Sequence, residues 1–169
     1  MIKPPRSAKR ILFVDDDEDT CEMIRILLEQ SGYRVATAGT IADALGLAEA
    51  DGFDFYLLDN WITDGEGIEL CRQLRALYPA CLVLFYSGVA HESEIEKANA
   101  AGADGYLVKP CEFELLQSTI AGLLKKKEQD ALVSQSQELV RTSRLLLVDS
   151  KRGNRKAQRL KKEKGYEAT

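Results

Sequence analysis

The sequence is poor in the residues that build zinc sites and disulfide frameworks. It contains one histidine and four cysteines, and no two of the cysteines form a C-x-x-C pair. This composition argues against both kinds of site and favours a reducing compartment. The sequence also lacks an apolar run of the roughly 20 residues that span a bilayer, and no apolar signal segment follows the basic N-terminus. We therefore expect a cytoplasmic protein that does not enter a membrane.

Acidic and basic residues are unevenly distributed along the chain. Residues 1–124 carry a net charge of −11 and residues 125–169 carry +7, which together give the −4 of the whole chain. A length of 169 residues suits one domain of ordinary size with an appendage. We therefore expect an acidic domain over residues 9–124, followed by two segments of a different kind, 125–143 and 144–169.

A short apolar segment ends in a cluster of carboxylates. Ile11–Val14 is a run of four apolar residues that predicts a buried strand, and three aspartates follow it at once. Adjacent carboxylates repel each other unless a cation lies among them, and Mg2+ prefers oxygen ligands. Helix capping is the alternative, and it suits Asp17 and Asp19. It explains less well why Asp15 and Asp16 directly follow the strand, so we predict that these two bind Mg2+.

Apolar strands and amphipathic helices alternate five times along residues 9–124. This alternation predicts a parallel sheet with helices on both faces and right-handed crossovers, which is a doubly wound α/β fold. We expect strands at Ile11–Val14, Arg34–Ala38, Phe53–Asp59, Cys81–Tyr86 and Gly105–Val108. We expect helices at Thr20–Gln30, between Thr40 and Gly52, and at Ile68–Tyr78, His91–Ala101 and Glu112–Leu124, with a turn at Gly65–Gly67.

Polar residues follow four of the five predicted strands. They are Asp15 and Asp16 after the first strand, Asp59 at the end of the third, Ser87 after the fourth and Lys109 after the fifth. The carboxyl ends of parallel strands meet at one edge of the sheet, where ligands bind. Three carboxylates, a hydroxyl and an ammonium suit phosphoryl transfer. In this interpretation Asp59 attacks phosphorus, while Ser87 and Lys109 donate hydrogen bonds to the phosphoryl oxygens.

Residues 9–124 resemble the receiver domain of two-component response regulators. The resemblance is carried by VDDD at 14–17, LLD at 57–59, DGEG at 64–67, SG at 87–88 and GADGYLVKP at 102–110. It implies the flavodoxin-like strand order 2-1-3-4-5. It also implies a cis peptide bond between Lys109 and Pro110, in keeping with the confinement of cis bonds to proline.

The resemblance implies how the acceptor and the metal are arranged. Asp59 would be the phosphoacceptor, and a histidine kinase or a histidine phosphotransfer protein would be the donor. Mg2+ would bind to Asp15, Asp16, Asp59 and the backbone carbonyl of Trp61. The chain departs from the family pattern at Thr63, because a proline often lies four residues after the acceptor.

The resemblance also implies a conformational switch. Ser87 would move toward the phosphoryl group, and the ring of Tyr106 would enter the vacated space. This would change the surface formed by the fourth helix, the fifth strand and the fifth helix, and would bias a two-state equilibrium. Such a protein is not an enzyme beyond phosphorylating itself from small donors and losing the phosphoryl group again. The sequence does not identify the downstream protein partner.

The last 45 residues are interpreted as two segments. Residues 125–143 are predicted to form a helical linker, in which apolar pairs seven residues apart give weak support for a coiled coil. Residues 144–169 resemble residues 10–36, and RLLLVD matches RILFVD. We therefore predict a truncated strand and helix of a second receiver, without the acidic cluster. The sequence allows a homodimer, and a nucleic acid partner is not expected because no helix-turn-helix signal is present.

Two other functions compete with the phosphoacceptor. One is an aspartate-nucleophile phosphatase of the haloacid dehalogenase type, in which Asp15 would attack and Asp17 would act as acid and base. This alternative leaves Asp59 unexplained, and no cap-domain insertion is visible. The other is a degenerate receiver that acts only as a binding module. The complete set of aspartates, serine and lysine argues against it.

Overall fold

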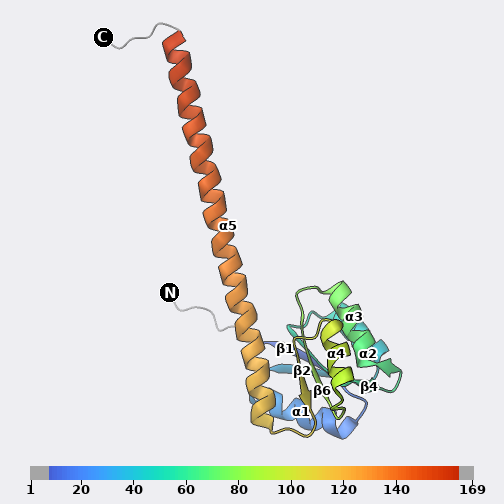
Figure 1. The fold of residues 1–169 in the computed structure, drawn as a ribbon. Coiled ribbons are helices and arrows are strands. Elements are labelled where there is room, and N and C mark those ends of the chain that lie inside the picture. Colours follow the sequence, from blue (N-terminus) through green and yellow to red (C-terminus); the bar gives the residue numbers. More distant parts are fainter. Residues whose placement is uncertain (1–7, 164–169) are drawn as a thin grey trace. The chain divides into compact units, whose positions relative to one another are not determined.

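The computed structural model describes residues 8–163 of the chain, with side chains described for residues 8–144. Five strands form one parallel sheet, and their order is the predicted 2-1-3-4-5. The first strand of the chain therefore lies inside the sheet, between the second and the third. In spatial order the strands are β2 (Arg34–Ala38), β1 (Arg10–Val14), β3 (Phe55–Leu58), β6 (Leu82–Ser87) and β7 (Gly105–Val108) (Figure 1).

Helices cover both faces of the sheet, as the alternating pattern predicts. Two of them, α1 and α5, pack their apolar side chains on one face, and the other three pack on the opposite face. The fold is therefore a doubly wound α/β sandwich of the flavodoxin-like type. The helices are α1 (Glu18–Gln30), α2 (Ile41–Ala50), α3 (Gly67–Leu77), α4 (Glu92–Ala100) and α5 (Phe113–Glu163).

The central strands β1, β3 and β6 are almost entirely apolar between their ends because both of their faces are buried, and the polar Ser87 is the last residue of β6. In β1, Ile11 and Phe13 lie in the cluster beneath α1 and α5, whereas Leu12 and Val14 lie in the opposite cluster. Successive strand side chains point to opposite faces, so a strand covered on both sides has no solvated position. All four residues of β3 and all six of β6 are likewise buried.

A short hairpin follows β3 and was not predicted as strand. Its strands β4 (Trp61–Ile62) and β5 (Gly65–Glu66) pair antiparallel, separately from the main sheet. The turn predicted at Gly65–Gly67 is thus divided between β5 and the first residue of α3. Gly67 is required there, because a Cβ atom would lie 1.9 Å from the backbone oxygen of Asp59. This close approach holds the start of α3 against the segment that follows β3.

The C-terminal part of the chain differs from the sequence-based expectation. The chain divides into two units, the second of which begins at Lys125, and α5 continues as a helix to Glu163. The strand predicted at the start of residues 144–169 is therefore wrong, because these residues lie in α5. An isolated strand would leave its backbone groups unpaired, whereas a helix pairs them internally. Residues 164–169, which carry the rest of the likeness to residues 10–36, lie outside the described residues.

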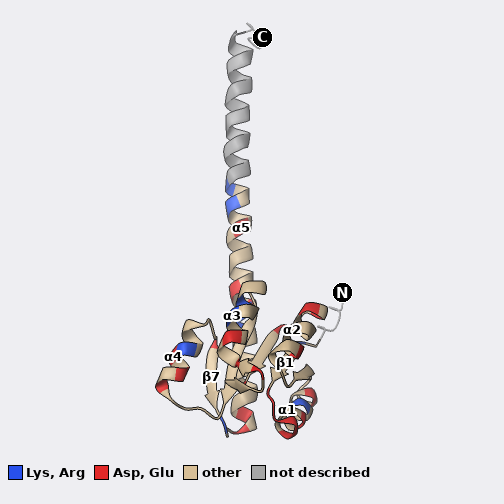
Figure 2. Cartoon of the chain, turned by 90° about the vertical axis from the view of Figure 1, so that its right-hand side faces the viewer, with Lys and Arg blue, Asp and Glu red and all other residues tan. Residues whose placement is uncertain are grey.

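The helices show two further properties, one of hydropathy and one of charge. Among residues 8–163, no helix combines the length and apolar character needed to cross a membrane. Acidic residues recur on α1 and α4 (Figure 2), and both helices have acidic residues in their first turn. Negative charge at that position is favoured by the helix dipole.

Candidate phosphoacceptor site

The two aspartates that follow β1 and β3 are fixed by backbone hydrogen bonds. The N–H of Asp15 donates to the carbonyl of Ala38 at 3.0 Å, and the N–H of Asp59 donates to the carbonyl of Val14 at 2.8 Å. The parallel pairing thus continues one residue beyond the strands and sets both side chains at the same edge of the sheet. This is the juxtaposition that the strand-end pattern predicts.

Asp59 is the most heavily contacted carboxylate of the site. Its Oδ1 accepts hydrogen bonds from the Ser87 hydroxyl at 2.6 Å and from the Asn60 N–H at 2.5 Å. Its Oδ2 accepts from Lys109 Nζ at 2.8 Å. The side chain of Asp59 is 15% exposed to solvent. Asp59 is therefore held in one orientation and is still accessible from solvent.

Lys109 is the cation of the site. Its backbone N–H donates to the carbonyl of Ser87 at 2.8 Å, and its bond to Pro110 is cis, as the resemblance implies. Its Nζ bridges Asp59 and Asp15, donating to one carboxylate oxygen of each. Burial opposes the ammonium charge, but these two hydrogen bonds raise the pKa of Lys109 above its ordinary value. Lys109 is therefore positively charged at neutral pH.

Asp15 is a buried carboxylate, with 2% of its side chain exposed. Besides the bond from Lys109, its Oδ1 accepts from the Asp17 N–H at 3.0 Å. Burial nevertheless raises the pKa of Asp15 above the usual value, because the loss of hydration outweighs the lysine and the N–H group. The ionised carboxylate of Asp15 is therefore destabilised by burial, and a cation bound beside it would stabilise the charge.

Asp16 and Asp17 have different surroundings. Asp17 is the N-cap of α1, and its side chain accepts from the Thr20 N–H at 2.7 Å. The hydrogen bonds from Thr20 lower the pKa of Asp17. Asp16 is exposed, and its Oδ2 accepts from the Thr63 hydroxyl at 3.1 Å. The contacts therefore confirm Asp17 as the helix cap, whereas metal binding by Asp15 and Asp16 stays a prediction.

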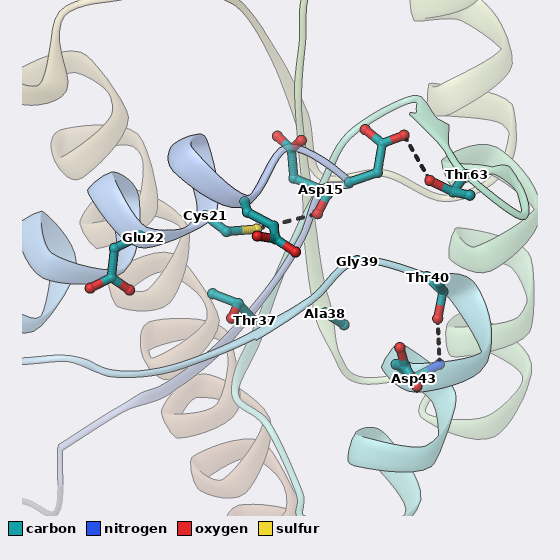
Figure 3. Close-up of a pocket in the computed structure, with 11 residues that line it drawn as sticks. Asp15, Cys21, Glu22, Thr37, Ala38, Gly39, Thr40, Asp43 and Thr63 are labelled. Atoms are coloured by element: carbon teal, nitrogen blue, oxygen red, sulfur yellow. Dashed lines mark hydrogen bonds between the residues drawn. The ribbon is translucent and has the colours of Figure 1, made fainter.

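A cavity of about 440 Å³ opens beside Asp15 and Asp16. It lies between the first turns of α1 and α2, and Figure 3 shows Asp15, Thr63 and Asp43 around it. The cavity leads from solvent to the edge of the sheet. From this side a hydrated cation has access to Asp15 and Asp16, which line the cavity.

The oxygen atoms at this edge fit Mg2+ by their chemistry. Carboxylates of Asp15, Asp16 and Asp59 are hard ligands, and the β4–β5 hairpin fixes the backbone of Trp61. Within residues 8–144, however, no three Asp, Glu, His or Cys side chains are grouped closely enough to hold a metal on their own. Lys109 takes one oxygen of Asp15 and one of Asp59. The metal assignment, with its backbone carbonyl, stays a prediction.

Tyr106 connects β7 to the loop that precedes α4. Its hydroxyl donates to the carbonyl of Val89 at 2.8 Å, and its ring stacks on Phe85 with centroids 5.7 Å apart and planes inclined by 9°. Ser87 lies two residues beyond Phe85 on β6, and its hydroxyl donates to Asp59. Of the two residues of the predicted switch, Ser87 thus contacts Asp59 and Tyr106 contacts the loop that follows β6. Their movement stays a prediction.

Three contact residues of the site were not predicted to hold it together. Asn60 is 1% exposed, and its Nδ2 donates to Glu94 of α4 at 3.1 Å. Asp64 accepts from the N–H groups of Ile41 and Ala42 at 2.6 and 3.1 Å, which caps α2. Thr63 contacts Asp16. The only sequence signal was the presence of polar residues directly after Asp59, because these contacts depend on the path of the loop.

Comparison with known proteins gives a consistent result. A family model described as the response regulator receiver domain matches residues 11–121. The nisin biosynthesis regulatory protein NisR of Lactococcus lactis is 31% identical over 121 residues, which are 72% of this chain and 52% of that protein. The transcriptional regulatory protein ZraR of Salmonella typhimurium is 36% identical over 110 residues, which are 65% of this chain and 25% of that protein. The chain therefore spans about half of the first relative and a quarter of the second.

Solved structures show the same similarity in three dimensions. A CheY-like receiver domain protein from Methanospirillum hungatei is 33% identical, with a TM-score of 0.71 over 73% of this chain and 99% of that one. A two-component response regulator from Clostridium difficile is 27% identical, with a TM-score of 0.67 over 69% of this chain and 96% of that one. In both cases nearly the whole of the other chain is matched by part of this one.

Proposed function

This chain belongs to the response regulator receiver domain family, and we propose that Asp59 is the residue that accepts the phosphoryl group. The observation that carries the proposal is the set of donors on its carboxylate. The Ser87 hydroxyl, the Asn60 N–H and the Lys109 ammonium all converge on Asp59. Preorganised donors of this kind can stabilise the charge of a transferring phosphoryl group without reorganising during the reaction.

The proposed reaction is a displacement at phosphorus. A carboxylate oxygen of Asp59 forms the new bond, and the bond between phosphorus and the donor's leaving atom breaks. Ser87 and Lys109 then donate to phosphoryl oxygens in place of the carboxylate. Mg2+, held by Asp15, Asp16, Asp59 and the Trp61 carbonyl, would neutralise charge on those oxygens.

The same contacts support a switch. In the structure the Ser87 hydroxyl donates a hydrogen bond to the carboxylate of Asp59. When Asp59 is phosphorylated, the hydroxyl donates to a phosphoryl oxygen instead, and Ser87 moves toward the phosphoryl group. Tyr106, now bound to Val89, then moves into the space that Ser87 leaves. The surface formed by α4, β7 and α5 changes as a result. A downstream protein that prefers one of the two forms would read the signal.

The proposed donor is a histidine kinase or a histidine phosphotransfer protein. The downstream partner is unidentified, and a homodimer stays an expectation. ZraR is named as a transcriptional regulatory protein, but this chain covers a quarter of it. The expectation that nucleic acid is not a partner is therefore a prediction for this chain, and so is its confinement to the cytoplasm.

The contacts disfavour the phosphatase alternative. Asp17 would have to act as the acid, yet it caps α1, and its pKa is lowered by hydrogen bonds from Thr20. A general acid needs a raised pKa to hold its proton near neutral pH. Asp15, the nucleophile in that alternative, is buried and bonded to Lys109.

One experiment separates the three functions. The protein, its Asp59→Ala variant and its Asp15→Ala variant are incubated with Mg2+ and acetyl phosphate, and both covalent phosphate and released phosphate are measured. A covalent adduct that requires Asp59 supports the phosphoacceptor. Turnover that persists without Asp59 but stops without Asp15 would establish the phosphatase. If none of the proteins reacts, the chain is a binding module only.

A further inference from the structure

Asp16 differs from the other predicted metal ligands in what holds it. Asp59 receives three hydrogen bonds, and buried Asp15 receives bonds from Lys109 and from the N–H of Asp17. The side chain of Asp16 is exposed, and the contact that the structure gives it is the Thr63 hydroxyl, 3.1 Å from Oδ2. Figure 3 draws this hydrogen bond as the dashed line at Thr63. The orientation of Asp16 therefore depends on a residue in a different loop.

Asp16 needs an external support because of its neighbours. Asp15 directly precedes it, and the carboxylates of Asp15 and Asp59 share a single lysine. Like charges at short range repel, so a freely rotating Asp16 carboxylate would turn toward water. The hydrogen bond from Thr63 opposes this rotation. It occupies Oδ2 and leaves the other carboxylate oxygen for a cation or for the cation's water.

Thr63 is itself held on a rigid support. Trp61 pairs with Glu66 and Ile62 pairs with Gly65, so Thr63 and Asp64 form the two-residue turn of the hairpin. Asp64 is anchored to the start of α2 by two hydrogen bonds, of 2.6 and 3.1 Å. The backbone of Thr63 is thus held on both sides, by the hairpin and by the anchored Asp64. The same hairpin carries the Trp61 carbonyl that the metal assignment includes.

We propose that Thr63 is a positioning residue that holds the carboxylate of Asp16 in place for a divalent cation. This inference rests on the proposed function, because it concerns the Mg2+ site of the phosphoacceptor. Groups that orient metal ligands from outside raise affinity by removing the ligands' freedom before the metal arrives. Thr63 does this with a hydroxyl, at a position where proline, which the family often has, could not donate a hydrogen bond.

The test compares Mg2+ binding by the wild type with binding by Thr63→Val and Thr63→Ser. Valine keeps the shape of threonine and removes the hydroxyl, whereas serine keeps the hydroxyl. Binding is followed in the complete chain by the fluorescence of Trp61, its single tryptophan, and again by calorimetric titration with magnesium chloride. We expect Thr63→Val to weaken Mg2+ binding about tenfold and Thr63→Ser to restore most of the affinity.

The matched control is Thr37→Val, because Thr37 lines the same cavity. It should bind Mg2+ as the wild type does, and the melting temperatures of all variants should agree, since Thr63 is exposed. Equal affinity of Thr63→Val and wild type would overturn this inference alone. A wild type that binds no Mg2+ would contradict the proposed function as well, so the two failures are distinguishable.

Discussion

Asp15 carries a charge that folding makes unfavourable. Its side chain is 2% exposed, and it shares Lys109 with Asp59, so two buried or half-buried carboxylates face one ammonium. Burial raises the pKa of Asp15, which means that the folded state holds a proton there more tightly than the unfolded chain does. The metal-free protein therefore loses stability as the pH rises from the pKa of Asp15 in the unfolded chain to its higher pKa in the folded protein, because Asp15 ionises in this range.

Asp15→Asn should stabilise the metal-free protein at neutral pH. Removing the charge ends its desolvation cost, and Lys109 keeps its bond to Asp59. We expect the free energy of unfolding to rise by on the order of 1 kcal/mol at pH 7. The gain should shrink as the pH falls toward the unfolded pKa, where Asp15 of the wild type is also neutral.

Urea denaturation in the presence of EDTA measures this effect. Asp19→Asn is the control, because Asp19 is exposed in the first turn of α1 and its charge is not buried. A decrease in stability for Asp15→Asn at pH 7 would show that the ion pair with Lys109 outweighs the burial of the carboxylate. Asp15→Asn should also lose Mg2+ binding. A variant that is more stable but does not bind Mg2+ would show that the Asp15 carboxylate serves metal binding at the expense of folding stability.

Among single residues, those at strand ends could be found from the sequence. Asp15, Asp59, Ser87 and Lys109 come together because the carboxyl ends of parallel strands share one edge. The contacts of Asn60 could not be found in this way. Its partner Glu94 lies 34 positions away on α4, and only the packing of that helix brings the two together.

The start of α2 is fixed by two residues from different parts of the chain. Thr40, its predicted N-cap, accepts from the Asp43 N–H at 3.0 Å. Asp64, from the hairpin after β3, accepts from the N–H groups of Ile41 and Ala42. The bond from Ile41 lowers the pKa of Asp64, so the ionised form is the one that stabilises the fold.

Asp64→Ala should lower the melting temperature at pH 7 by roughly 2–5 °C, because the N–H groups of the first two residues of α2 lose their acceptor. The stabilisation exists above the unfolded pKa of Asp64 and is lost as the pH falls through its lowered folded value. The difference between the variant and the wild type should therefore be smaller at an acidic pH below the ordinary pKa of an aspartate than at pH 7. Thermal denaturation followed by circular dichroism at both pH values tests this. An equal difference at both pH values would mean that the charge of Asp64 is not what stabilises α2.

Elements were predictable to the extent that local pattern and tertiary packing agree. The five strands and the first four helices follow the apolar periodicity of the sequence to within a few residues. Strands β4 and β5 have two residues each, which is too short for a period to show. The strand predicted at the start of residues 144–169 failed for a different reason. Its apolar run matches Arg10–Val14 in composition, but no neighbouring strands pair with it there.

The two apolar clusters of the molecule lie entirely within its first unit. All of their members come from residues 11–124, and the family model matches residues 11–121. Residues 129–144 of α5 are exposed at every position, including Leu132 and Leu139. Among the residues whose side chains are described, every core residue therefore belongs to the first unit.

A chain that ends at Leu124 should fold on its own. We expect a single cooperative unfolding transition with a melting temperature within about 5 °C of the whole chain's, since the buried apolar area is retained. It should also keep the Asp59-dependent reaction with acetyl phosphate. Loss of the cooperative transition would show that residues 125–169 contribute to the stability of the first unit.

The central claim is that Asp59 forms an acyl phosphate, and chemical trapping tests it most directly. The protein is treated with Mg2+ and acetyl phosphate and then reduced with borohydride, which converts an aspartyl phosphate to homoserine. Peptide mass spectrometry locates the converted residue. The account predicts homoserine at Asp59, only when Mg2+ is present. Conversion at Asp15 instead, or no conversion at any aspartate, would contradict it.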